Sequence, residues 1–140
     1  MNLRLDTPAR RIEVARLVSM SAERQVLRGL LNMLVLAVLQ RGALHGYAVR
    51  DALRQGSSGR FDVSEGTVYP ALQRLEHLGL VSSSWAVVDR RHIRVYELTP
   101  AGRDKLSADC LAWQGFVAAV GTLLEPQPGR TSSESTQASP

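Results

Sequence analysis

The feature that most constrains the fold of this chain is a change in its apolar pattern after Gly79. Before Gly79, the stretch SEGTVYPALQRLEHLGLV places apolar residues three and four positions apart, which is typical of one face of a helix. The residues of that face are Val68, Leu72, Leu75 and, one turn later, Leu78. After Gly79, residues 81–88 and 92–98 alternate apolar and polar side chains. This change predicts a helix followed directly by a two-stranded antiparallel hairpin, with a charged tip at Asp89-Arg90-Arg91.

The first two turns of this helix contain Gly66 and Pro70, where packing alone would favour Ala or Leu. Gly costs backbone entropy in a helix, and Pro lacks the N–H that a helix interior uses. We expect Pro70 to be tolerated because the regular helix begins near Thr67, behind Ser64 as its N-cap. Packing alone therefore does not account for Gly66 and Pro70 at the beginning of this helix.

Three further helices surround this unit. The first runs from about residue 22 to residue 41 and ends at Gly42. The second lies in LHGYAVRDALRQG, with Tyr47, Ala48, Ala52 and either Val49 or Leu53 facing inward, and His45 as a capping or packing residue. The last begins at Thr99-Pro100 and continues to about Leu124. Three helices, a hairpin and a helix define a mainly α fold with a small β-hairpin: a winged helix-turn-helix domain plus a C-terminal dimerisation helix.

The boundaries follow from these elements. Residues 1–22 form an N-terminal leader, residues 23–99 the winged helix-turn-helix domain, and residues 100–125 the dimerisation helix. Residues 126–140 are poor in apolar side chains and predict a disordered tail. Within the leader, Thr7 and Pro8 suit the start of a short basic helix with Val14, Leu17 and Val18 on one face. Met20 offers an alternative start, in which case the leader is an artefact of start-site choice.

Composition limits the classes of function. The formal charge of +4 and the pI near 10.0 favour acidic partners only mildly. The single cysteine, Cys110, excludes an intramolecular disulfide and a multi-cysteine metal site, which fits a reducing, cytoplasmic location. The apolar run LLNMLVLAVL is about half the length that a bilayer span requires. No enzyme, metal or cofactor site is predicted, because the three histidines are scattered and have no partners at ligand spacing: His45, His77 and His92.

Four stretches resemble the PadR family of bacterial transcriptional regulators. They are LRGLLNMLVLAVLQRGALHGYAV, SEGTVYPALQRLEHLGLV, SSSW and YELTPAG, and the resemblance covers about residues 24–124. It implies a dimeric winged-helix DNA-binding protein, usually a repressor, that a small molecule or another signal releases. In this family the β-hairpin is called the wing, and it commonly has Gly at its tip and a paired Tyr in its return strand. Here the tip reads VVDRRH, and Val95 replaces the first Tyr. We therefore expect a short wing that is less able to make a tight turn with positive φ.

The candidate DNA-binding residues lie on the third helix and the hairpin. Hydroxyl groups of the third helix would contact phosphates, Gly66 would allow close backbone approach, and Gln73 and Arg74 would contact base edges. The full set is Ser64, Gly66, Thr67, Tyr69, Gln73, Arg74, Arg90, Arg91 and Arg94. Glu65 and Glu76 oppose a purely electrostatic mode. The alternative interpretations are a solvated helix face with a kink, and a charged hairpin that only protects a sheet edge.

The last helix has a heptad pattern of apolar residues that predicts a dimer interface. The pattern consists of Leu106, Cys110, Trp113, Val117, Val120 and Leu124, widened by Leu111, Phe116 and Leu123. The alternative is packing against the first helix of the same chain. A two-fold dimer would place two recognition helices about 34 Å apart, on an inverted-repeat operator.

An effector site is the last candidate. The family resemblance implies that some members bind flat aromatic compounds near the dimer interface, where Trp113 would stack, with Trp85 as a second candidate. The competing interpretation of Trp113 is interface core. Cys110, one turn earlier, has two interpretations, a redox sensor or a buried apolar residue. One alternative function stays open: a dimeric ligand- or protein-binding module that has the same fold but does not bind DNA.

Overall fold

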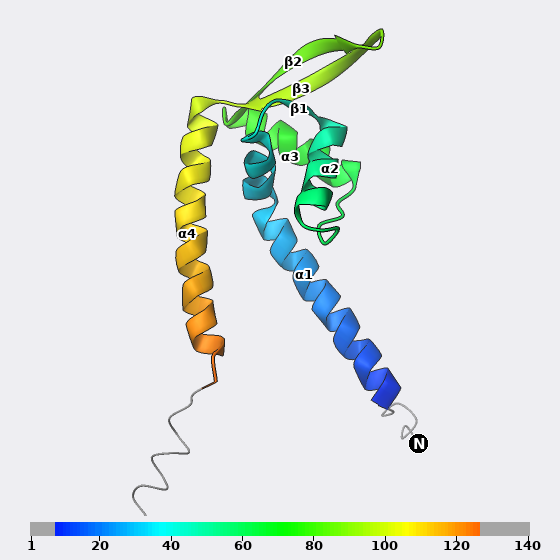
Figure 1. Ribbon diagram of the computed structural model, residues 1–140, viewed down its shortest axis with the longest axis vertical. Coiled ribbons are helices and arrows are strands. Elements are labelled where there is room, and N and C mark those ends of the chain that lie inside the picture. The colour runs from blue at the N-terminus through cyan, green and yellow to red at the C-terminus, as the bar shows by residue number, and fades with distance from the viewer. Residues whose placement is uncertain (1–7, 127–140) are drawn as a thin grey trace, which may run out of the picture. The chain divides into compact units, whose positions relative to one another are not determined.

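The computed structural model describes residues 8–126, and the order of its elements matches the predicted fold class (Figure 1). The chain divides into two compact units after Leu106. The elements are α1 (Pro8–Leu39), β1 (Leu44–His45), α2 (Gly46–Gly56), α3 (Glu65–His77), β2 (Val81–Val88), β3 (Arg91–Leu98) and α4 (Pro100–Leu124). The first unit contains the elements from α1 to β3 and the first turns of α4, and we call it the body.

Helix α1 is longer than predicted. It runs without interruption from Pro8 to Leu39, so the leader and the first helix are one element, and the predicted start near residue 22 is wrong. Pro8 is its first residue, as predicted. Between Pro8 and Gly29 the sequence has neither Pro nor Gly, so nothing breaks the helix where the apolar pattern weakens. The side chains of residues 17–21, including Leu17, Val18 and Met20, lie outside the described part of the chain.

The core lies where the second half of α1 meets α2, α3 and the base of the sheet. Its members are apolar residues from these elements, from the loop before α3 and from the beginning of α4: Leu31, Val35, Leu36, Leu39, Val49, Leu53, Val63, Val68, Ala71, Leu72, Leu75, Val81, Tyr96, Leu98 and Leu106. Burying a side chain of this size stabilises the fold by about 1.5–3 kcal/mol. The prediction for α2 is wrong for Tyr47, which is 53% exposed, whereas Val49 and Leu53, offered as alternative inward-facing residues, are both buried. Leu78 is also exposed, because α3 ends at His77.

The sheet has three strands in the order β1-β3-β2, one more than predicted. Strand β1 has only two residues, too few to produce an alternating pattern in the sequence, and pairs Leu44 with Tyr96. Strands β2 and β3 form the predicted hairpin, in which Val88 pairs with Arg91. Asp89 and Arg90 alone form the turn, with φ of 51° and 64°, as in a type I′ turn. The expectation that a tip without Gly disfavours a tight turn is therefore wrong.

Helix α4 begins and ends where the sequence predicts. The Thr99 hydroxyl accepts a hydrogen bond from the Gly102 N–H at 3.0 Å and donates one to the Gly79 carbonyl at 2.7 Å. A Cβ on Gly102 would lie 2.0 Å from the Leu80 carbonyl oxygen, so the first turn of α4 packs directly on the backbone after α3. Leu106 is the last buried apolar residue along α4. By length and composition α4 is the one described helix that could cross a membrane, and a single such helix is weak evidence.

Candidate nucleic-acid interface

The beginning of α3 is open to solvent. Ser64 occupies the N-cap position, but its side chain makes no capping hydrogen bond, so that part of the prediction is wrong. Its hydroxyl oxygen instead lies 3.1 Å from that of Thr67, and both residues are exposed. The first amides of α3 are thus not covered by the Ser64 side chain. Exposed amides at a helix N-terminus, next to two hydroxyl groups, suit a phosphate oxygen.

Packing does not require glycine at position 66. A Cβ there would meet only the Ser64 hydroxyl, at 3.8 Å, which is ordinary contact. Gly66 therefore reduces the intrinsic stability of α3 without making room for any other described part of the chain. The helix begins at Glu65 and not near Thr67, so Pro70 lies in its second turn, contrary to the prediction. Pro70 is exposed, and the Gly66 carbonyl has no N–H to accept from at that position.

Tyr69 connects the beginnings of α2 and α3. Its ring lies so close to Gly46 that a Cβ on Gly46 would come within 2.7 Å of it. His45 caps α2, because its Nδ1 accepts a hydrogen bond from the Ala48 N–H at 3.3 Å, as the capping interpretation predicted. Tyr47, which was predicted to be buried, is instead an exposed member of this surface. A hydrogen bond with Glu65 and the charge of that carboxylate raise the pKa of Tyr47.

The two carboxylates that were predicted to oppose DNA are both paired with arginine. Glu65 Oε1 lies 3.9 Å from Nη1 of Arg50, and Nη2 of Arg50 lies 3.8 Å from Asp62 Oδ1. Glu76 Oε1 lies 3.5 Å from Nη2 of Arg94. Partly exposed pairs of this kind contribute little to stability, about 0–1 kcal/mol. They do lower the negative potential that an approaching phosphate would meet.

The predicted base-contacting residues are both exposed but lie differently. The Gln73 side chain makes no hydrogen bond to the described residues and faces solvent on the outer side of α3, beside Pro70 and His77. Arg74 Nη2 lies 3.5 Å from the Asn32 side-chain oxygen, so its guanidinium extends toward α1. The structure thus brings the six predicted residues of α3 and its N-cap onto one accessible helix.

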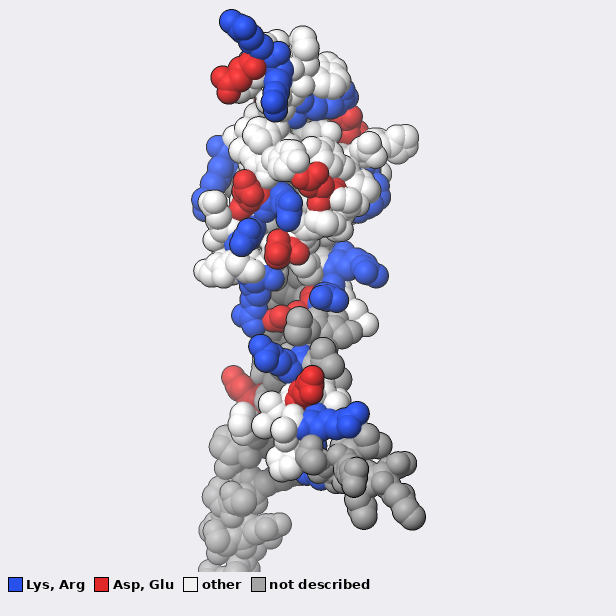
Figure 2. All heavy atoms as spheres, turned by 90° about the vertical axis from the view of Figure 1, so that its right-hand side faces the viewer, with Lys and Arg blue, Asp and Glu red and all other residues white. Residues whose placement is uncertain are grey.

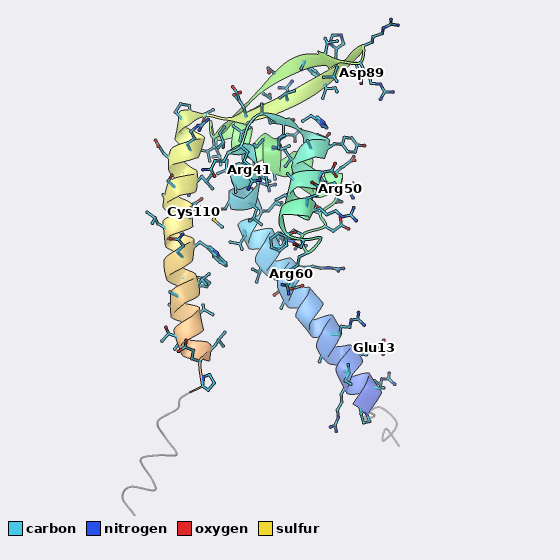
Figure 3. The ribbon with its side chains drawn as sticks, in the orientation of Figure 1. Glu13, Arg41, Arg50, Arg60, Asp89 and Cys110 are labelled. Carbon is cyan, nitrogen blue, oxygen red and sulfur yellow. The ribbon has the colours of Figure 1, made fainter. Side chains whose placement is uncertain are left out.

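The arginines of the wing, the β2–β3 hairpin, fall into two groups. Arg90 and Arg91 lie beside Asp89 at the end of the hairpin, where basic side chains gather (Figures 2 and 3). Neither of them forms an ion pair within residues 8–126. Arg94 lies nearer the body, pairs with Glu76 and stands 5.2 Å from the centroid of the Trp85 ring. The tip therefore carries two cations that are available to an acidic partner.

The predicted dimer residues of α4 beyond Leu106 are accessible within a single chain. Cys110 is exposed, so the expectation of a buried cysteine is wrong for the chain alone. Trp113 is partly covered by Phe116, with ring centroids 5.8 Å apart in a stacked arrangement. The other exposed members of the heptad pattern are Val117, Val120 and Leu124. Trp85 lies on the open wing, and no group of His, Cys, Asp or Glu among the described residues could hold a metal ion.

Comparison with protein families gives one match that covers slightly more than half of the chain. The model of the family described as "Transcriptional regulator PadR-like family" matches residues 35–108. The transcriptional regulator Rv3488 of Mycobacterium tuberculosis is 55% identical over 49 residues, which is 35% of this chain and 46% of that protein. An uncharacterised 37.1 kDa protein in transposon TN4556 of Streptomyces fradiae is 42% identical over 78 residues, 56% of this chain and 21% of that protein. The chain thus spans less than half the length of these two relatives.

Two solved structures extend the comparison over most of the chain. The PadR family transcriptional regulator from Eggerthella lenta is 31% identical, has a TM-score of 0.72, and aligns over 83% of this chain and 99% of its own. A transcriptional regulator from Clostridium thermocellum is 24% identical, with a TM-score of 0.67, over 72% of this chain and 99% of its own. The second likeness concerns the fold alone.

Proposed function

Because this chain belongs to the PadR-like family of transcriptional regulators, whose members bind DNA, generally as dimers, we propose that it is a dimeric repressor of an inverted-repeat operator. The family consists of regulators and not of enzymes, and membership implies a soluble, cytoplasmic protein. The apolar composition of α4 is not enough to indicate a membrane protein. What is proposed is the repressor role, the operator symmetry, the contacts and the effector.

The observation that carries this proposal is the open beginning of α3. It combines exposed hydroxyl groups, a glycine that packing does not require, and a carboxylate that an arginine already pairs. A helix with its side chains is about 10–12 Å wide, which fits the major groove of B-DNA. In this arrangement Ser64, Thr67 and Tyr69 contact phosphates, while Gln73 and Arg74 contact base edges.

The wing and α4 complete the proposed complex. Arg90 and Arg91 follow the flanking backbone or enter a narrow minor groove, which attracts arginine. Two copies associate along the heptad pattern of α4, together with α1, and two-fold symmetry sets the half-sites about 34 Å apart. A flat aromatic effector binds near Trp113 and changes the spacing of the two recognition helices, so that effector and DNA favour different states.

The first test is a fluorescence-anisotropy titration against the gene's own upstream region, at two salt concentrations and with a shuffled duplex as control. We expect binding that prefers the upstream duplex, with two chains per site. The logarithm of the affinity should fall by about 0.9 per phosphate contact for each tenfold increase in salt. Salt-insensitive binding without sequence preference would contradict the proposal and favour a ligand- or protein-binding module.

Gly66 provides the sharpest variant. Gly66→Ala should stabilise α3 by up to about 1 kcal/mol, because the site is open and Ala is the better helix former. The same change should weaken operator binding at least tenfold if the backbone at this position approaches the duplex. Gln73→Ala should instead change which sequence is preferred. If Gly66→Ala is more stable and binds the operator as the original chain does, the close approach at Gly66 is wrong.

A further inference from the structure

Three elements meet at the base of the wing through polar side chains. The Glu76 carboxylate, at the end of α3, accepts a hydrogen bond from the Ser83 hydroxyl of β2. The same carboxylate pairs with the guanidinium of Arg94 on β3, whose centre stands 5.2 Å from the Trp85 ring. We call Glu76, Ser83, Trp85 and Arg94 the wing clasp.

The clasp lies near the base of the hairpin, so a small movement there produces a larger movement at the tip. Ser83 pairs with Tyr96 and Trp85 with Arg94, so these four side chains lie on one face of the hairpin. Tyr96 on this face is buried, whereas Trp85 is 64% exposed. The clasp therefore lies where the hairpin leaves the body, and its hydrogen bond and ion pair join α3 to both strands of the hairpin.

Tyr96 shows how closely the charges of the clasp approach the core. Burial raises the pKa of its hydroxyl, the Arg94 charge opposes that increase, and the Glu76 charge adds to it. Both charged groups thus act on the same buried ring. Arg94 differs in this respect from Arg90 and Arg91, which lie at the exposed tip.

We propose that Glu76 is a positioning residue for the wing. By holding Ser83 and Arg94, it fixes the angle between α3 and the hairpin, so that Arg90 and Arg91 meet the DNA backbone while α3 occupies the major groove. Arg94 then acts through the clasp and not through a phosphate contact of its own. This inference rests on the proposed DNA binding.

The length of the hairpin beyond Arg94 makes the position of its tip sensitive to a change at Glu76. The tip lies four residues beyond Arg94, or roughly 13 Å at about 3.3 Å per residue. A tilt of about 10° at the clasp would move the tip by about 2 Å, enough to break a hydrogen bond to a phosphate. A small change at Glu76 is therefore expected to disengage both arginines of the tip.

The test uses the sign of the electrostatic effect. Glu76→Gln removes a negative charge near the proposed interface, so a purely electrostatic role predicts tighter DNA binding. The clasp predicts about tenfold weaker binding, and a salt slope that falls toward that of the Arg90→Ala/Arg91→Ala variant. Glu97→Gln is the matched control, because Glu97 is exposed on β3 and pairs with Ser82 on the opposite face. It removes the same charge and should bind as tightly as the original chain, or slightly more tightly.

A double-mutant cycle and a measurement without DNA complete the experiment. In the Arg90→Ala/Arg91→Ala background, Glu76→Gln should no longer weaken binding, since there is no tip contact left to position. Without DNA, in a Trp113→Phe background, Glu76→Gln should shift the emission of Trp85, and thermal unfolding should show a folded chain. Arg94→Lys should weaken binding as Glu76→Gln does, because Lys keeps the charge but lacks the planar fork.

The outcomes separate the two proposals. The positioning role of Glu76 is wrong if Glu76→Gln binds DNA as tightly as the original chain with an unchanged salt slope. It is also wrong if the effect of Glu76→Gln persists in full without Arg90 and Arg91. In both cases the proposed DNA binding stands. If the original chain does not bind DNA but Glu76→Gln shifts the Trp85 emission, the proposed function fails. The positioning role fails with it, and the clasp is only structural.

Discussion

The body and the outer part of α4 both have regular apolar patterns, but they use them differently. In the body, the apolar faces of α1 and α3 meet, and Leu36, Leu72 and Leu75 are almost completely buried. In the outer part of α4, the residues beyond Leu106, the heptad pattern continues. Leu111 and Leu123, which widen this pattern, are 72% and 83% exposed. The same type of pattern thus completes a core in one region and leaves an apolar surface in the other.

This difference indicates which part of the molecule folds by itself. The body buries its apolar groups against one another, so it needs no second chain to form a core. A helix in water gains most of its stability from packing, and large exposed apolar surfaces usually mark contact sites. We therefore expect the body to be stabilised mainly by its own residues, and the outer part of α4 by the second copy that the proposed dimer supplies.

The largest expected effect sharpens this comparison within the body. Leu72→Ala should lower the free energy of unfolding by about 2–5 kcal/mol, because it leaves a cavity among fully buried neighbours. Leu111→Ala removes the same atoms from a position that is exposed in the single chain, so at concentrations below those of the proposed dimer it should cost less than about 1 kcal/mol. Urea denaturation of both variants, at equal protein concentration, measures the difference. Equal losses would mean that the outer part of α4 is core as well.

The next prediction would break the comparison if it failed. Val117→Glu places a charge in the middle of the heptad pattern and should weaken the dimer roughly 100-fold, about 3 kcal/mol. Ala119→Glu adds the same charge to the same turn of α4 but off the pattern, and should leave the dimer intact. Sedimentation analysis over a range of concentrations reports both. A dimer that survives Val117→Glu would show that the copies meet elsewhere.

The sequence predicts regular elements of this fold well where one periodicity dominates. The apolar face of α3 and the alternation of β2 and β3 were correct because each residue's surroundings repeat along the chain. The two-residue β1 has no such repeat, and α1 begins at Pro8 because a polar helix can extend beyond the apolar pattern that revealed it. The tip was mispredicted because Asp89 and Arg90 both adopt positive φ, which costs non-glycine residues about 1–2 kcal/mol each and is rarely expected.

The candidate site was predictable only in part. Gly66 and the hydroxyl groups of α3 stand out because they conflict with helix propensity in one short stretch. The pairs Glu65–Arg50 and Glu76–Arg94 join residues 15 and 18 positions apart, and no local pattern encodes them. Tyr47 is predicted to face the core, whereas it is 53% exposed and the Glu65 carboxylate raises its pKa. Partners of this kind follow from the tertiary fold.

A smaller effect is expected where α4 leaves the body. Gly102→Ala should destabilise the chain by about 1–3 kcal/mol, because its Cβ would collide with the Leu80 carbonyl oxygen and a backbone atom cannot easily move aside. The change should shift the urea midpoint without altering the dimer constant. If Gly102→Ala is neutral, the close contact between α4 and the backbone after α3 is absent, and the body ends before α4 begins.

The smallest effect concerns a glycine of the outer part of α4. A Cβ on Gly115 would meet nothing within 4 Å, and Gly115 lies on the side of the helix opposite to Cys110, Trp113 and Val117 in the heptad pattern. Gly115→Ala should therefore raise the free energy of unfolding by up to about 1 kcal/mol, the difference in helix propensity, and leave the dimer constant unchanged. Thermal unfolding and sedimentation measure the two quantities separately. A weaker dimer would mean that the second copy also contacts the Gly115 side, so that α4 is enclosed on more than one face. A gain in stability with an unchanged dimer constant would mean that the second copy contacts the heptad face of α4 and leaves the Gly115 side in solvent.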